Sequence, residues 1–237
     1  MMPEPENSNR EHTRDETGDA WLLEKLPLEI TRTETQKKRS DRLSLFHKEQ
    51  FLAGVSTTIA DRLALHAGSI LTQGLLRKIR QEEDREKAFA SGYSLIAIRD
   101  HSEQEFIQKL KRRGFSDEIV QSCRRSFADK DLLNDVRFAV QFAQGKFSVN
   151  AWGPSKILSA LRRKGISEAI ARKALEDTFQ EDDATESCIQ LIQKREAHFR
   201  REVDPIKRKQ KVFRFLHSKG YTMDVIHASS KEIEWLC

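Results

Sequence analysis

Positively charged side chains gather in three short clusters, each beside an apolar helical stretch. The clusters are Lys109, Lys111, Arg112 and Arg113; Arg162, Arg163 and Lys164; and Lys207, Arg208, Lys209 and Lys211. Ammonium and guanidinium groups bind phosphates and carboxylates, so aligned clusters would form one positive ridge for an anionic partner. The same residues also complement the negative C-terminal end of a helix, and this structural role is a second interpretation.

Catalytic and cofactor-binding motifs do not occur in the sequence. The seven histidines show no i, i+4 pairing with one another and no cysteine at zinc-ligand spacing. The glycine-rich loops that bind nucleotides and dinucleotides are missing, as is the serine elbow of hydrolases. The sequence therefore predicts a protein that is not an enzyme and has no catalytic residues, metal ligands or cofactor.

The basic clusters belong to a helix–glycine–helix corner that recurs along the chain. Its glycines, Gly114, Gly165 and Gly220, are 51 and 55 positions apart. A glycine after the last helical turn supplies the positive φ that the chain reversal needs. Two residues later comes a hydroxyl side chain that can cap the next helix, namely Ser116, Ser167 and Thr222. Three such corners predict stacked supersecondary units.

The composition fits thin helical layers with a large surface. Hydrophobic residues make up 38% of the chain and charged residues 33%, with a net charge of +5. No apolar run approaches the length of a membrane span, and no secretory leader is recognisable. The three cysteines form no C-x-x-C pair. These features predict a soluble protein of the reducing cytoplasm.

The N-terminal third differs in composition from the region that contains the helix–glycine–helix corners. Residues 1–28 are polar and charged and are expected to form a disordered tail, whose apolar residues near Trp21 either dock on the fold or bind a partner. Residues 29–83 predict a small antiparallel β-meander followed by helices, the first of them capped by Ser56. The charged stretch from Arg80 to Lys87 is expected to be solvated.

The rest of the chain predicts three three-helix repeats, over residues 84–133, 134–182 and 183–237. Ser102 and Glu105 form a capping-box pattern before the first corner helix, and Pro154 and Pro205 occupy the first turn of the second and third. The predicted fold is mainly α, with the repeats in an elongated curved array behind a small antiparallel β and helix extension.

The combination of these repeats resembles the RecX family of regulators of the RecA recombinase. The resemblance covers residues 84–230, and 30–79 resemble a β-containing extension of some members. The motifs that carry it are Ser102-x-x-Glu105 with Leu110-x-x-x-Gly114-Phe115; Asp135-x-Arg137-Phe138-Ala139; and Gly153-Pro154 with Leu161-x-x-Lys164-Gly165-Ile166.

The resemblance implies a regulator that lies in the groove or at the end of the RecA–single-stranded DNA filament. It would mostly inhibit recombinase, ATPase and co-protease activities in recombination, DNA repair and the SOS response, and ATP hydrolysis would belong to RecA. We expect a monomer without a membrane anchor. The residues predicted to contact the partner are Lys109, Arg112, Arg113, Arg137, Arg162, Arg163, Lys164, Lys207, Arg208 and Lys209.

Two other functions fit the same sequence features. A stand-alone nucleic-acid-binding protein, with single- or double-stranded DNA as its ligand, would use the same basic ridge and show a steep salt dependence. A scaffold would instead recruit a partner through the N-terminal tail. Filament binding that is unchanged when residues 1–27 are deleted would exclude the scaffold.

Overall fold

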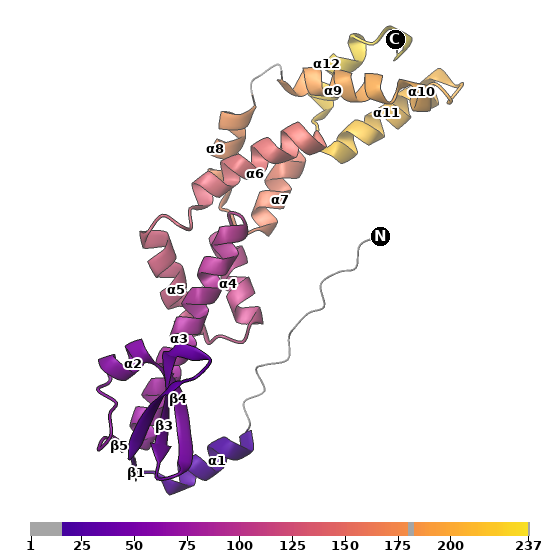
Figure 1. The fold of residues 1–237 in the computed structure, drawn as a ribbon. Helices are drawn as coiled ribbons and strands as arrows, with labels where there is room; N and C mark the ends of the chain where they lie inside the picture. The colour runs from indigo at the N-terminus through magenta and orange to yellow at the C-terminus, as the bar shows by residue number, and fades with distance from the viewer. Residues whose placement is uncertain (1–15, 180–182, 237) are drawn as a thin grey trace. The chain divides into compact units, whose positions relative to one another are not determined.

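The computed structural model describes residues 16–179 and 183–236, and the fold is mainly helical, as the sequence predicts (Figure 1). The chain divides into two compact units, residues 1–87 and residues 88–237. Helix α3 (Gln73–Ile98) begins in the first unit and ends in the second. The small sheets belong to the first unit and the helical repeats to the second.

The first unit is built on a three-stranded antiparallel meander, which confirms the prediction for this segment. Its strands are β2 (Arg32–Gln36), β3 (Arg39–His47) and β4 (Gln50–Ser56). In this register Leu45, which is fully buried, pairs with Thr33 on one side and Ala53 on the other. A second, unpredicted pair consists of β1 (Leu28–Glu29) and β5 (Ile70–Leu71). Helix α2 (Thr57–Arg62) follows, and the Ser56 hydroxyl caps it as predicted.

Helix α1 (Glu16–Lys25) lies where the sequence predicts disorder, so that prediction is wrong for residues 16–25. Leu22 is buried in the core of the first unit, and Trp21 and Leu26 pack against the same core. Burial of these apolar side chains offsets the entropy of ordering the segment. The tail therefore docks on the fold in this part, while residues 1–15 lie outside the described residues.

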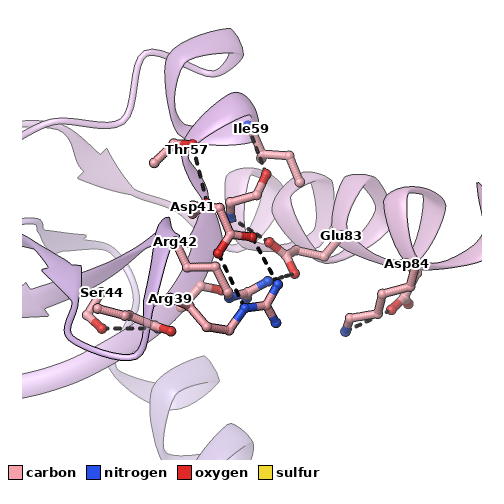
Figure 2. Close-up of polar contacts among 12 residues, drawn as sticks. Arg39, Asp41, Arg42, Ser44, Thr57, Ile59, Glu83 and Asp84 are labelled. Atoms are coloured by element: carbon pink, nitrogen blue, oxygen red, sulfur yellow. Dashed lines mark hydrogen bonds and ion pairs between the residues drawn. The ribbon is translucent and has the colours of Figure 1, made fainter. Parts of the chain in front are cut away.

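Glu83 contradicts the prediction that the charged stretch of α3 is solvated. It is buried, and its carboxylate accepts hydrogen bonds from the Ser56 amide at 2.7 Å and from Arg42 Nη1 at 2.9 Å (Figure 2). Arg42 also donates to the carbonyl of Gly54 at 3.0 Å. The buried pair links the meander to α3 within the first unit. Because no glycine or proline occurs in the charged stretch, α3 also runs unbroken across the boundary that the sequence predicts between residues 83 and 84.

The second unit contains three helical repeats, each with its own apolar core. Its further helices are α4 (Glu103–Arg112), α5 (Asp117–Asp129), α6 (Asp135–Asn150), α7 (Pro154–Arg163), α8 (Glu168–Thr178), α9 (Asp183–Lys194), α10 (Glu196–Phe199), α11 (Pro205–Lys219), α12 (Met223–Lys231) and the 3-10 turn Glu234–Leu236. Phe106 and Phe127 are buried in the first core, Ile157 in the second and Leu216 in the third. Each repeat thus buries its own apolar stripe.

The corner glycines have the predicted backbone conformation. Their φ angles are +85° at Gly114, +81° at Gly165 and +94° at Gly220. The predicted caps are confirmed at the first two corners, where the Ser116 and Ser167 hydroxyls accept amide hydrogen bonds. At the third corner the prediction is wrong, because the Thr222 side chain makes no capping hydrogen bond although its backbone angles suit the position.

Two junctions join the repeats, and at both the residue before a corner helix donates a hydrogen bond to the carbonyl that precedes the next corner glycine. At the first junction, the Ser102 hydroxyl at the start of α4 donates to the Lys164 carbonyl at 2.7 Å. At the second junction, the Gly153 amide at the start of α7 donates to the Lys219 carbonyl at 2.8 Å. The corner of each following repeat therefore packs on the beginning of the corner helix in the repeat before it (Figure 1).

Candidate partner-binding surface

Arg137, in the first turn of α6, binds acidic groups of its own chain. Its Nη1 lies 2.7 Å from Asp131 Oδ2, its Nη2 donates to the Asp131 carbonyl at 2.9 Å, and its Nε lies 3.7 Å from Asp100 Oδ2. The nearby Asp135 instead accepts a hydrogen bond from the Glu103 amide at 2.9 Å. Arg137 thus stabilises the loop before α6, and its side chain keeps about a third of its surface exposed.

Lys109, in the first basic cluster, points at a buried histidine. Its Nζ lies 2.7 Å from Nε2 of His101, which is only 2% exposed, and the His101 Nδ1 lies 2.8 Å from the Arg99 carbonyl. Burial is the main cause that lowers the pKa of His101. The neutral ring donates from Nδ1 to the carbonyl and accepts from Lys109 at Nε2. Burial also lowers the pKa of Lys109, and the half-buried ammonium group is held against His101 within the repeat.

The two arginines of the first cluster are exposed. Arg112 donates to the carbonyl of Gln108, and Arg113 donates weakly, at 3.4 Å, to the carbonyl of Ser91. Neither of these contacts involves a negatively charged side chain. Both positively charged guanidinium groups are therefore accessible to an anionic partner.

In the second basic cluster two cations form ion pairs within the fold and the third is exposed to solvent. Lys164 crosses the first junction, with its Nζ 2.5 Å from Glu105 Oε1. Arg162 forms an ion pair with Glu168 at the start of α8. Arg163 is exposed, and no acidic side chain in the described part of the chain lies within 4 Å of it.

The third basic cluster lies along α11. Lys207 is at the limit of an ion pair with Asp204, 4.0 Å away. Arg208 is half-buried, with its guanidinium 6.0 Å from the Trp235 ring, and donates to the carbonyl of Glu202 at 3.4 Å. Lys209 is exposed and has no carboxylate within 4 Å among the residues that the structure describes.

A groove of about 750 Å³, called the α11–α12 groove, runs along α11 to the start of α12. Its lining includes Ile206, Lys209, Phe213, Arg214, His217 and Met223. A second hollow of about 400 Å³ shares His217 and Met223 with it and continues over the second junction to Arg163 on α7. Two predicted contact residues, Lys209 and Arg163, therefore line adjoining hollows, whereas no residue of the first cluster lines either one.

The apolar floor of the α11–α12 groove was not predicted from the sequence. Ile206 and Met223 are 70% and 46% exposed, and Phe213 is half-buried. A signal was present, because Ile206 and Phe213 are seven residues apart and lie off the buried stripe formed by Val212 and Leu216. The cations of this helix are conspicuous in the sequence, whereas its second apolar edge consists of widely spaced residues.

Residues 16–179 and 183–236 contain neither a candidate metal site nor a candidate membrane-spanning helix. No cluster of three or more histidine, cysteine or acidic side chains could hold a metal ion there. None of the helices in these ranges combines the length and apolar character needed to cross a membrane.

Comparisons with known proteins point to one family. Models of the first, second and third three-helix domains of RecX match residues 88–123, 134–175 and 181–228. The regulatory protein RecX of Clostridium perfringens strain 13 is 28% identical over 196 residues, which cover 82% of this chain and 91% of the relative. That of Bacillus subtilis strain 168 is 25% identical over 206 residues, covering 87% and 77%.

Solved structures share the fold. A crystal structure of a regulatory protein RecX has a TM-score of 0.69 at 23% identity, covering 84% of this chain and 97% of that one. RecX from Lactobacillus salivarius has a TM-score of 0.60 at 21% identity, covering 65% and 98%. The three domain matches together span just over half of the chain, in the order of its repeats. The chain belongs to the RecX family.

Proposed function

We propose that this protein regulates the RecA recombinase by binding the RecA–single-stranded DNA filament. Binding in the filament groove or at its end would lower strand exchange, ATP turnover and co-protease activity, in recombination, DNA repair and the SOS response. Membership of a family whose curated relatives are named regulatory proteins supports a regulatory role. The sequence carries no nucleotide-binding loop, so ATP hydrolysis is assigned to RecA and this protein acts without catalysis.

The observation that carries the proposal is the pair of adjoining hollows on the second and third repeats. They present Arg163 and Lys209, two cations without carboxylate partners in the described residues, beside an apolar floor. A surface of this kind suits a protein partner with acidic and apolar groups, because phosphates alone would leave the floor exposed to water. Arg112 and Arg113 are further candidate contacts, whereas Arg137, Arg162 and Lys164 contribute mainly through the geometry of the repeats.

The proposal places the protein in the cytoplasm as a monomer. Light scattering of the purified protein at several concentrations checks the second statement. A molecular mass that stays near 27.5 kDa is expected, and a mass that rises toward twice this value would contradict a monomer.

The test is RecA-mediated strand exchange with and without this protein at far less than one copy per RecA. Suppression of strand exchange is expected. A parallel titration of the protein against single-stranded DNA without RecA separates the alternatives. No effect on strand exchange, together with DNA binding that falls log-linearly with salt, would contradict the proposal and favour a stand-alone nucleic-acid-binding protein.

A further inference from the structure

The lining of the α11–α12 groove includes apolar side chains that are exposed to solvent. Ile206 is 70% exposed and Met223 46%, at the two ends of the groove. Between them lies Phe213, which His227 holds edge-on with ring centroids 4.9 Å apart. A concave apolar surface with a rigid aromatic residue at its centre is typical of a site that binds another side chain.

The rim of the groove is positively charged. Lys209 and Arg214 are exposed, and His217 lies one turn beyond Arg214 on the same helix. No carboxylate of the described residues lies within 4 Å of any of these three groups. Nearby acidic residues pair elsewhere or lie apart from the lining, since Asp204 caps α11 and Asp224 does not line the groove. The charge that would complement this rim is negative.

The length of the groove indicates what could fill it. Eleven residues of α11 separate Ile206 from His217, which corresponds to roughly 16 Å at 1.5 Å per residue. A partner helix of about three turns has this length and presents apolar side chains at three- and four-residue spacing along one face. Such a helix could place these side chains on the floor while its flanking carboxylates meet Lys209 and Arg214.

We propose that the α11–α12 groove binds a short acidic amphipathic helix of the partner protein. The identity of that partner as RecA rests on the proposed function, whereas the chemistry of the ligand rests on the groove alone. A nucleic-acid backbone is the less suitable ligand. Its phosphates would pair with the rim but leave the apolar side chains Ile206, Phe213 and Met223 exposed to water.

A direct binding experiment tests the groove. The probe is a fluorescein-labelled synthetic peptide of about four helical turns, with leucines spaced three and four residues apart and glutamates on the flanking positions. Its binding to the full chain is followed by fluorescence anisotropy. The double variant Ile206→Glu with Lys209→Glu is expected to bind it at least about tenfold more weakly, because it removes one apolar and one cationic contact.

A matched control distinguishes the groove from general attraction between opposite charges. Val149→Glu with Lys173→Glu changes the net charge equally at two exposed positions that line neither hollow. This variant is expected to bind the peptide within about twofold of wild type, and circular dichroism of both variants should show native helicity. Equal weakening in both variants, or no weakening from replacing the peptide's leucines with alanine, would overturn the proposal.

Two further arms separate this inference from the proposed function. Displacement of the peptide by an equimolar amount of oligothymidylate would overturn the inference, because it would identify the groove as a phosphate site. Peptide binding with no effect of the protein on strand exchange would support the inference while contradicting the RecA assignment. Suppressed strand exchange without peptide binding would support the RecA assignment and contradict the inference about the groove.

Discussion

Lys164 and Glu105 form an ion pair across the first junction, with Nζ 2.5 Å from Oε1, although 59 positions separate them in the sequence. Arg99 binds the other oxygen of the same carboxylate at 3.1 Å. Burial alone would raise the pKa of Glu105, but the hydrogen bonds and charges of Lys164 and Arg99 outweigh it and lower the pKa to about 2. The pair therefore joins two repeats and also makes their junction sensitive to pH.

Replacement of Glu105 by glutamine should destabilise the protein in a way that depends on pH. The folded-state pKa lies below the ordinary value of 4.5, so the charged carboxylate contributes stability above about pH 4.5 and loses it as the pH falls toward 2. We expect a loss on the order of 2 kcal/mol near neutral pH. Thermal melts at about pH 7 and pH 3 measure it.

The control for this prediction is Glu176→Gln, which removes an exposed carboxylate from α8 in the same unit. It should leave the melting temperature nearly unchanged at both pH values. An equal difference between wild type and Glu105→Gln at the two pH values would contradict the assigned role of the ion pair.

Two corner glycines provide a matched pair of substitutions. Gly114 and Gly165 have nearly the same positive φ, but only at Gly165 would an added Cβ overlap a neighbour, the side chain of Gln104 across the first junction. Gly114→Ala should cost about 1–2 kcal/mol through the backbone alone. Gly165→Ala should cost about 1–3 kcal/mol more, because the junction must also open. Chemical denaturation measures both, and equal losses would refute the packing of the corner on α4.

Neighbouring glutamates of α3 offer another comparison. Glu83 is buried and binds Arg42 and the Ser56 amide, whereas Glu82 pairs with the half-exposed Arg62 at the surface. Glu83→Gln should cost about 3–5 kcal/mol, because the half-buried Arg42 would lose the carboxylate that balances its charge. Glu82→Gln should cost less than about 1 kcal/mol. Hydrogen exchange of the β3 and β4 amides checks this, and similar protection in the two variants would contradict the role given to Glu83.

Much of the fold could be predicted from local signals. The corner glycines, the caps at Ser116 and Ser167 and the alternating β-meander depend on residues within a few positions of one another, and such patterns are legible in a single sequence. The burial of Glu83 was missed because its partner Arg42 lies 41 positions away. A charged stretch is normally solvated, so only the folded structure identifies the one member that is not.

The candidate site was less predictable for a related physical reason. The basic clusters are visible in the sequence, but the sequence does not say which of their cations form ion pairs within the fold. Lys164 and Arg163 are adjacent, but Lys164 forms an ion pair across the first junction whereas Arg163 is exposed to solvent. The apolar floor beside Lys209 depends on how α11 and α12 meet, which no local pattern specifies.

The same adjacent pair gives a mutational test of the surface. Arg163→Glu should weaken the effect on RecA filaments by about tenfold in effective concentration. Its melting temperature should be unchanged, because no acidic side chain among residues 16–179 and 183–236 lies within 4 Å of Arg163. Lys164→Glu should lower the melting temperature, since it would face Glu105. Activity titrations and thermal melts of both variants separate the two roles. A destabilised Arg163→Glu, or a stable Lys164→Glu, would reverse the assignment.

We propose that this chain regulates RecA filaments, and the decisive experiment is a measurement of ATP turnover by RecA on single-stranded DNA. The protein is added at about one copy per ten or more RecA protomers, with the Arg163→Glu and Lys209→Glu double variant as the comparison. Suppressed turnover is expected with wild type and much weaker suppression with the variant. Turnover that is unchanged by wild-type protein up to equimolar amounts would contradict it.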